Sequence, residues 1–363
     1  MVMRVPRLVR SDSKIEHLCT RLREIASAQG PNTRLPTVDE LCLLLSTSRV
    51  TLTEVLKQLE SQQVLYRQHS KGIFVSPYIH RKNIGIVLNS TLFMARGASP
   101  FWGMLWGLFA QEARKREMQG NLLHSFYGAF QGETQIELPE ECQQMILAQR
   151  FQGVLTIGLS VQENEWILDQ GVPCVAFAGG CPWVVALDQL QFVRMAIRSM
   201  AQQNCRSLEF WLHSSYGEND PDLVEQLDGI QANQGLIFDS VQLRIGHERP
   251  TLQEQGYQMA MEVFGQTKKP HPDGIILLDD MMTDGVLAAF QVLGIHTGQD
   301  VTIVTHSNLN SMLLFTALPG ITVLEFDPTE TVQAMFTLLD TLMMGQTPAL
   351  SPVRISPRFR ERI

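Results

Sequence analysis

The sequence predicts an α/β protein in which an N-terminal winged helix-turn-helix is followed by a two-lobed, doubly wound parallel-sheet sensor domain. First, residues 1–80 contain three amphipathic helical patterns followed by two short apolar runs. Second, short apolar runs alternate with helical patterns from residue 83 onward, which is typical of parallel strands joined by crossover helices. Third, this alternation restarts near Leu187, which indicates two similar halves.

Length, composition and charge set the broad class. The chain has 363 residues, of which 44% are hydrophobic and 18% charged, as expected of a globular protein with two or three domains. Residues 1–80 hold 11 Lys and Arg against 7 Asp and Glu, a net charge of +4, whereas the overall net charge is −8. A basic module on an acidic body favours a polyanionic partner, although +4 over 80 residues also lies within ordinary scatter.

The compartment is predicted from what the sequence lacks. No apolar run approaches the roughly 18 residues of a membrane helix, and no apolar export signal follows Arg10. The six cysteines form no CxxC pair, which favours free thiols in a reducing compartment. We therefore expect a soluble cytoplasmic protein with no membrane partner.

Three helices and a hairpin are predicted within the first 77 residues. The first helix follows the apolar spacing of Ile15–Ile25, and the second opens at Thr37, which has Glu40 three residues on in a capping-box pattern. A third helix follows the polar turn 46–48, and two short helices joined in this way indicate a helix-turn-helix. Strands at 64–66 and 73–75, joined by a basic turn, complete a winged module.

Three runs in this module resemble the gluconate-repressor (GntR) type of bacterial DNA-binding domain, over about residues 14–77. They are Arg34–Thr37, Ser48–Leu52 and Lys71–Val75. The family has an Arg where this chain has Thr53. The resemblance implies that double-stranded DNA is contacted by one set of residues: Arg34, Thr37, Ser48, Arg49, Thr51, Lys71 and Gly72.

Elementary chemistry is compatible with these DNA contacts. A helix start placed in the major groove would direct Arg49 at a guanine edge, while Ser48 and Thr51 would contact phosphates. Gly72 would let the wing backbone approach the minor groove. Taken singly, Arg49 and Lys71 also fit solvated surface charges.

The body is expected to form one cleft-containing domain at 83–363, after a linker at 78–82. Its predicted elements include a strand at 207–212 and helices at 222–231, 252–264 and 281–293. Ligands of such folds bind at the carboxyl ends of the strands, in the cleft between lobes. We expect the first lobe to comprise 83–186 and 307–325, and the second lobe 188–304 and 328–355.

The body resembles the effector domain of the lactose/galactose-repressor (LacI/GalR) family, which has a periplasmic-binding-protein-like fold, over about residues 83–358. The matching segments are Ser99–Phe101, Gly153–Leu155, Gly171–Val175, Pro272–Gly274 leading to Asp279–Gly285, Pro319–Val323 and Pro357–Arg358. The resemblance implies that an aromatic ring at Phe101 stacks on the ligand and that Asp280 binds its hydroxyls. The candidate ligand-binding residues are Phe101, Trp102, Asp188, Gln226, Asp280 and His306.

Alternatives remain open at several of these positions. Phe101 and Trp102 also fit packing of the first body helix, and Asp280 also fits a cap for a helix that begins at Met281. Gln226 stands where many sugar-sensing relatives have an Arg, and Thr305–Asn308 replaces a segment that is acidic in relatives. A neutral sugar or polyol therefore fits the cleft, as does a ligand selected by stacking and amide hydrogen bonds.

The expected function is a bacterial transcription regulator, a repressor similar in arrangement to the arabinose repressor, controlled by a sugar-like effector. Because helix-turn-helix proteins read paired half-sites, a homodimer on a palindromic operator is expected. The alternative is a solute-binding or sensor protein without enzymatic activity. No GxGxxG, P-loop, GxSxG or HExxH motif occurs, so we expect no enzyme, no cofactor and no metal.

Overall fold

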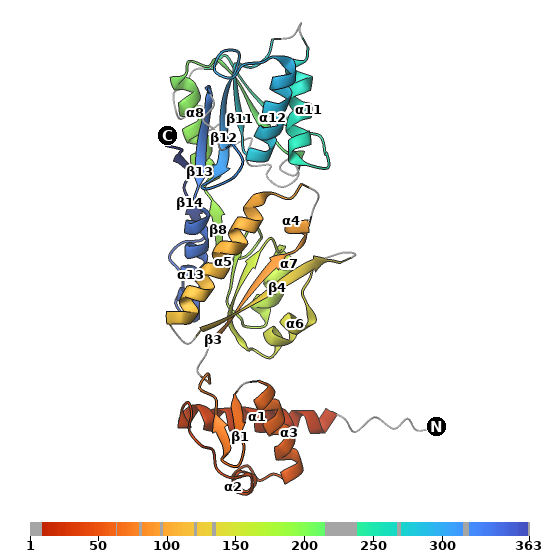
Figure 1. Cartoon of the computed structure of the whole chain (residues 1–363), viewed down its shortest axis with the longest axis vertical. Helices are drawn as coiled ribbons and strands as arrows, with labels where there is room; N and C mark the ends of the chain where they lie inside the picture. Colours follow the sequence, from red (N-terminus) through yellow and green to blue (C-terminus); the bar gives the residue numbers. More distant parts are fainter. Residues whose placement is uncertain are drawn as a thin grey trace, which may run out of the picture. The chain divides into compact units, whose positions relative to one another are not determined.

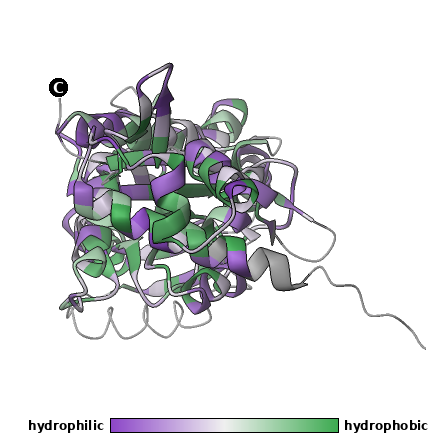
Figure 2. Ribbon diagram, turned by 90° about the horizontal axis from the view of Figure 1, so that it is seen from below, coloured by the Kyte–Doolittle hydropathy of each residue, from purple (hydrophilic) through white to green (hydrophobic). Residues whose placement is uncertain are grey.

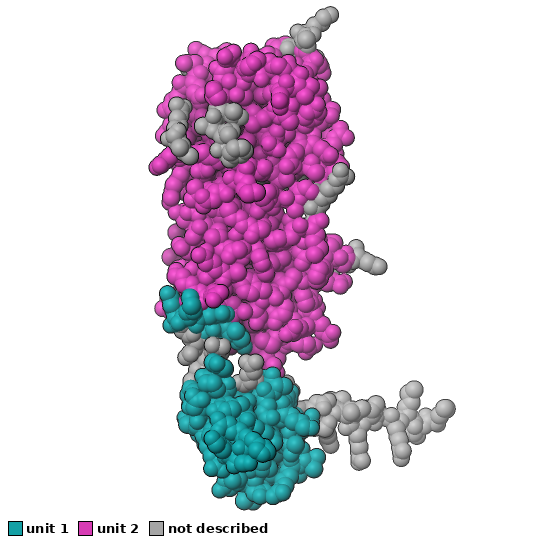
Figure 3. All heavy atoms as spheres, in the orientation of Figure 1, with its two compact units in different colours: residues 1–83, 116–123 teal, residues 84–115, 124–363 magenta. Residues whose placement is uncertain are grey.

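The computed structural model describes residues 9–62, 64–79, 82–94, 97–119, 122–132, 136–214, 238–266, 270–314 and 319–361. The chain divides into two compact units, residues 1–83 with 116–123 and residues 84–115 with 124–363 (Figure 3). The predicted helix at 222–231 and the candidate Gln226 lie outside the described residues. Among the helices that are described, none is both long and apolar enough to span a membrane.

The first unit is a winged helix-turn-helix in its described part. Its core is formed by apolar side chains such as Leu22, Leu41 and Leu52, all fully buried. The two strands pair antiparallel and bring the rings of Tyr66 and Phe74 to 5.6 Å. Its elements are α1 (Val9–Gln29), α2 (Val38–Leu44), α3 (Arg49–Ser61), β1 (Leu65–Gln68) and β2 (Gly72–Val75).

The second unit contains two lobes, each built on a mostly parallel sheet. The first-lobe sheet has the strand order β14-β8-β7-β6-β3-β4-β5. Helices α5 and α13 lie side by side (Figure 1), and the rings of Phe109 and Phe336 meet between them at 5.9 Å. The first lobe comprises β3 (Lys82–Asn89), α4 (Thr91–Met94), α5 (Pro100–Gln119), β4 (Leu122–Gln131), β5 (Ile136–Glu137), α6 (Glu140–Leu147), β6 (Phe151–Ile157), α7 (Val161–Asp169), β7 (Cys174–Phe177), β8 (Val184–Leu187), α13 (Pro328–Met343) and β14 (Val353–Ile355).

The second lobe has the strand order β10-β9-β11-β12-β13-β15, in which only the β13–β15 pair is antiparallel. Helices α11 and α12 cross so closely that a Cβ added at Gly285 would lie 2.0 Å from the carbonyl oxygen of Gln253. The second lobe comprises α8 (Gln189–Gln202), β9 (Ser207–Leu212), β10 (Ser240–Ile245), α11 (Leu252–Phe264), β11 (Gly274–Leu277), α12 (Asp280–Leu293), β12 (Thr302–Asn308), β13 (Ile321–Phe326) and β15 (Arg358–Phe359).

Capping side chains fix where the helices of the second lobe begin. Asp188 accepts a hydrogen bond from the Gln191 amide at 3.0 Å, which starts α8. Thr251 and Asp279 cap α11 and α12 in the same way. Figure 2 shows hydrophobic and hydrophilic residues interspersed along the helices, as expected of helices that bury one face.

The fold class predicted from the sequence is confirmed, but the division of the C-terminal third between the lobes was predicted wrongly. Residues 321–326 form β13 in the second-lobe sheet, whereas we expected 307–325 in the first lobe. Conversely, α13 packs on β6, β7 and β8, and β14 pairs with β8, so 328–355 belongs to the first lobe. Periodicity identifies a buried strand or helix, but the sheet that it joins depends on contacts far away in sequence.

Candidate functional site

The start of α3 exposes a short polar segment. Ser48 is the N-cap, and its Oγ accepts a hydrogen bond from the Thr51 amide at 3.2 Å. The two hydroxyl groups also hydrogen-bond to each other at 2.9 Å. Arg49 and Val50 follow the cap, and Val50 is 81% exposed although it is apolar. The sequence analysis missed Val50, whose methyl groups suit contact with a thymine methyl group.

Arg49 is held by a carboxylate from the preceding helix. Its Nε donates to Asp39 Oδ1 at 2.7 Å, and the two side chains form an ion pair while 71% and 65% exposed. This hydrogen bond raises the pKa of Arg49, so the guanidinium remains charged. The pair leaves Arg49 on the surface, close to the helix start.

The Arg34 segment and the wing form one surface. The Leu35 amide donates to the Ile73 carbonyl oxygen at 2.9 Å, which joins the segment to β2. Gly72 has φ +117°, and a Cβ added there would lie 3.1 Å from Arg34 Nε. The backbone conformation therefore favours glycine at this position, and a side chain there would displace the Arg34 guanidinium slightly.

Thr37, a predicted DNA contact, and Thr53, which stands where the family has an Arg, both make local hydrogen bonds. Thr37 forms the predicted capping box, because its amide and hydroxyl both donate to Glu40 Oε2, at 2.7 and 2.8 Å. Thr53 Oγ1 donates to the Arg49 carbonyl oxygen at 2.7 Å, within α3. Lys71 lies exposed in the wing turn. Thr37 and Ser48 remain exposed, so capping leaves them accessible.

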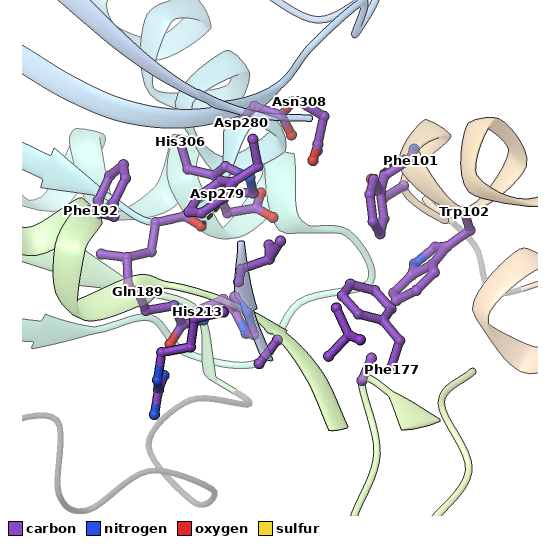
Figure 4. Close-up of a pocket in the computed structure, with 18 of the residues that line it drawn as sticks. Phe101, Trp102, Phe177, Gln189, Phe192, His213, Asp279, Asp280, His306 and Asn308 are labelled. Atoms are coloured by element: carbon purple, nitrogen blue, oxygen red, sulfur yellow. Dashed lines mark hydrogen bonds between the residues drawn. The ribbon is translucent and has the colours of Figure 1, made fainter. Parts of the chain in front are cut away.

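A cleft of about 610 Å³ is lined by residues of both lobes of the second unit, a volume typical of small-molecule sites. Three aromatic side chains form the first-lobe side of this cleft. The ring centroids of Phe101 and Trp102 are 5.0 Å apart, and both rings lie close to that of Phe177, at 6.0 and 6.4 Å. Figure 4 shows these three rings grouped on one side, opposite Asp279 and Asp280.

Two adjacent carboxylates lie on the second-lobe side of the cleft and have different structural roles. Asp279 is the N-cap of α12, accepting from the Met282 amide at 2.9 Å. Asp280 is 3% exposed, and its Oδ2 accepts hydrogen bonds from the hydroxyls of Ser307 and Ser311, each at 3.2 Å. The capping role that the sequence left open for Asp280 therefore belongs to Asp279, because α12 begins one residue earlier than predicted.

Burial and charge change the pKa values of two groups in the cleft. Burial raises the pKa of Asp279 to about 7, with a further increase from the neighbouring Asp280 carboxylate. Burial lowers the pKa of His306, although Asp280 and the Leu278 carbonyl oxygen oppose this effect. His306 Nδ1 lies 3.1 Å from that carbonyl oxygen, which favours the neutral tautomer with the proton on Nδ1.

Two buried polar atoms at the end of β12, on two neighbouring side chains, have no well-aligned hydrogen bond within the described residues. They are His306 Nε2 and Asn308 Oδ1, and both side chains line the cleft. The two side chains lie close enough to interact with each other, and this incomplete pairing leaves both able to hydrogen-bond to a ligand in the cleft. Asp280, His306 and Asn308 together present acceptors to the cleft.

The structure brings together four of the six predicted ligand-binding residues: Phe101, Trp102, Asp280 and His306 line the cleft. Asp188 lies outside the lining residues, whereas its neighbour Gln189 is one of them. The sequence analysis missed cleft-lining residues that follow strands in the chain or end them, a position that could have identified them: Phe177, His213, Asp279 and Asn308. Burial lowers the pKa of His213 to about 4. Within the described residues, no cluster of three or more His, Cys, Asp or Glu side chains could hold a metal ion.

Each of the two units matches a known protein family. Residues 19–75 match the model of the bacterial regulatory proteins of the gntR family, and residues 200–363 match the periplasmic binding protein-like domain. The uncharacterized HTH-type transcriptional regulator YurK of Bacillus subtilis (strain 168) is 35% identical over 72 residues, 20% of this chain. That match spans 30% of the length of YurK.

Solved structures share the fold of the second unit. A regulatory protein of the LacI family from Chloroflexus aggregans has a TM-score of 0.60 at 16% identity, covering 76% of this chain and 96% of that one. A LacI family regulator from Enterococcus faecium with bound ribose has a TM-score of 0.57 at 17% identity, covering 77% and 97%. The chain therefore joins a domain of the bacterial gntR regulatory family to a periplasmic-binding-protein-like domain with the fold of LacI-type regulators.

Proposed function

We propose that this protein is a DNA-binding transcription regulator whose operator affinity is controlled by a small effector in the cleft of the second unit. The observation that carries the proposal is the presence, in one chain, of a gntR-type helix-turn-helix and a two-lobed cleft lined by aromatic rings and buried polar side chains. The cleft binds a ligand in this role and catalyses no reaction. Such a regulator acts in the cytoplasm, where bacterial DNA is found.

The first unit supplies the DNA contacts in this proposal. The start of α3 enters the major groove, where Arg49 can donate two hydrogen bonds to guanine and Val50 can contact a thymine methyl group. Ser48 and Thr51 contact phosphates, and Arg34 and Lys71 extend the contact to the wing, where Gly72 allows close approach of the backbone. The operator is a palindrome bound by a homodimer, because each helix-turn-helix reads one half-site.

The cleft selects the effector through two unlike walls. The aromatic side of Phe101, Trp102 and Phe177 covers the apolar face of a ligand. The opposite wall offers polar atoms of Asp280, His306 and Asn308, which suit a ligand that donates hydrogen bonds. A neutral sugar or polyol has both properties, since its ring exposes C–H groups on one face and hydroxyl donors around its edge.

The experiment has two steps on the full-length protein. Selection from random duplex DNA yields the preferred site, which should be a palindrome. The affinity for that site is then measured at several salt concentrations and should fall steeply as the salt concentration rises. A thermal-shift screen of sugars, polyols and nucleosides next identifies the effector, which must also change the affinity for the selected site. Enrichment of no sequence would overturn the DNA assignment, and a cleft ligand that leaves DNA affinity unchanged would overturn the control by effector.

A further inference from the structure

Two cysteines meet beside the cleft. Cys174 begins β7 and is fully buried, whereas Cys181 lies seven residues later and is half-buried. The Cys181 Sγ donates to the Cys174 carbonyl oxygen at 3.5 Å, and the two thiols are also close enough to interact by a side-chain hydrogen bond. Both cysteines are free.

The loop between these cysteines forms part of the cleft wall. Ala178 and Gly179 line the cleft, and Ala178 has a left-handed backbone with φ +51°. A Cβ added at Gly179 would lie 2.1 Å from the carbonyl oxygen of Leu159, so the loop is packed directly on a neighbouring backbone. A non-glycine residue with positive φ at a site wall marks a segment whose conformation depends on its surroundings.

One side chain connects the buried thiol to this loop. Asn164 is fully buried, and its Oδ1 accepts from the Cys174 thiol at 3.6 Å. Its Nδ2 donates to the Gly180 carbonyl oxygen at 2.8 Å. Conversion of the thiol to a disulfide would remove one donor to Asn164 Oδ1 and leave the Thr156 hydroxyl, which donates to the same oxygen at 2.7 Å. The loop is hydrogen-bonded to the Nδ2 side of the same amide.

We propose that Cys174 and Cys181 form a redox-sensitive pair that hydroperoxides oxidise to a disulfide, and that this reaction alters the cleft wall at residues 178–180. The Cys181 thiolate attacks one peroxide oxygen, the O–O bond breaks, and the released oxygen takes a proton to leave as water or an alcohol. Cys181 is then a sulfenic acid. The Cys174 sulfur attacks the Cys181 sulfur, the S–O bond breaks, and the hydroxide leaves as water with the Cys174 proton. The thiols lose two electrons, which the peroxide gains.

The surroundings assign the two roles. The hydrogen bond with Cys174 lowers the pKa of Cys181, so the more exposed sulfur is also the better nucleophile. The same contact, followed by burial, raises the pKa of Cys174, which suits a thiol that reacts second. Burial raises the pKa of Cys142 to about 12 and also raises that of Cys205, so both are internal controls for unreactive thiols.

The test uses the full-length reduced protein and a few equivalents of hydrogen peroxide, followed by alkylation and peptide mass spectrometry. Disulfide formation removes two hydrogen atoms from the segment that contains Cys174 and Cys181. We expect the rate of this loss to be at least about tenfold higher than the rate at which Cys142 or Cys205 is oxidised. Cys181→Ser should abolish this loss. Cys174→Ser should leave Cys181 as a sulfenic acid that dimedone traps, while Cys142→Ser should behave like the wild type.

Hydrogen exchange on the oxidised and reduced proteins tests the effect on the cleft. We expect altered exchange at residues 177–183 in the oxidised wild type and no change in peroxide-treated Cys181→Ser, whose half-buried site tolerates the isosteric change. Oxidation of Cys181 that stops before the disulfide, or a disulfide to another cysteine, would overturn the pair. A disulfide without altered exchange would overturn its effect on the cleft. Neither measurement uses DNA or an effector, so the result is independent of the proposed regulator function.

Discussion

The N-terminal unit and the cleft assemble their polar groups in different ways. The residues proposed to contact DNA come from three contiguous runs within 34–72, and each run is ordered by a local cap, turn or hairpin. The cleft residues come from segments between 99 and 354 that meet only after two sheets have formed. The first arrangement should tolerate change one residue at a time, whereas the second should depend on distant packing.

The largest effect is therefore expected from a packing change in the second lobe. In Gly285→Ala, the new methyl group would lie 2.0 Å from the Gln253 carbonyl oxygen, and overpacking of this kind costs about 3 kcal/mol. Urea unfolding should show the loss of stability. The matched control is Gly107→Ala, at an exposed position of α5 with no atom near the new Cβ, which should stabilise the protein by about 0.5–1 kcal/mol. Equal stability of the two variants would contradict the close crossing of α11 and α12.

The second prediction separates the two carboxylates of the cleft. Asp280→Ala should weaken effector binding about 100-fold, because hydrogen bonds to a charged group contribute about 1.5–3 kcal/mol each. Calorimetry with an effector from the screen measures this change, and affinity for the operator without effector should remain that of the wild type. The control is Asp279→Asn, which preserves the cap. Loss of operator affinity in Asp280→Ala would show that the two units do not act separately.

These two regions also differ in how far the sequence predicted them. The capping box of Thr37 and the hairpin that contains Gly72 were predicted correctly, because their signals are local. Helix α11 was also predicted at its observed bounds, 252–264. The lobe that α13 joins was predicted wrongly, since an apolar helix face does not reveal which sheet it covers. Asn308 and Phe177 end strands, which marks them as candidates, but which strand ends face the cleft follows only from the meeting of the lobes.

The third prediction concerns the helix start in the first unit. Arg49→Ala should reduce operator affinity about 10- to 100-fold, with the loss concentrated at one base position, as expected for a bidentate guanine contact. Competition against single-base operator variants measures this. Equal weakening on all sequences would make Arg49 a phosphate contact, and an unchanged affinity would remove it from the interface.

The fourth prediction follows from the raised pKa of Asp279, about 7 in the folded protein. Between its ordinary pKa near 4 and about 7, the folded state retains a proton that the unfolded state releases, so stability falls as pH rises through this window. Asp279→Asn should lack this contribution and gain about 1–2 kcal/mol relative to wild type at pH 8, a value reduced by the access of solvent to the cleft. Urea unfolding from pH 4 to 8 measures it; parallel pH profiles of the two proteins would contradict the raised pKa.

The smallest effect on stability and on DNA affinity is expected at the exposed ion pair of Asp39 and Arg49. Asp39 pairs with Arg49 at the start of α3, the segment proposed to contact DNA, and an exposed ion pair contributes little to stability. Asp39→Asn should therefore leave the unfolding free energy nearly unchanged but raise affinity for all DNA sequences a few-fold, because it removes a negative charge near the phosphates and releases Arg49. The slope of log affinity against log salt should steepen by roughly 0.9, the value for one additional neutralised phosphate. Weaker operator binding by Asp39→Asn would instead mean that Asp39 orients Arg49 toward its base, and the operator variants used for Arg49→Ala would show this as a loss at the same position.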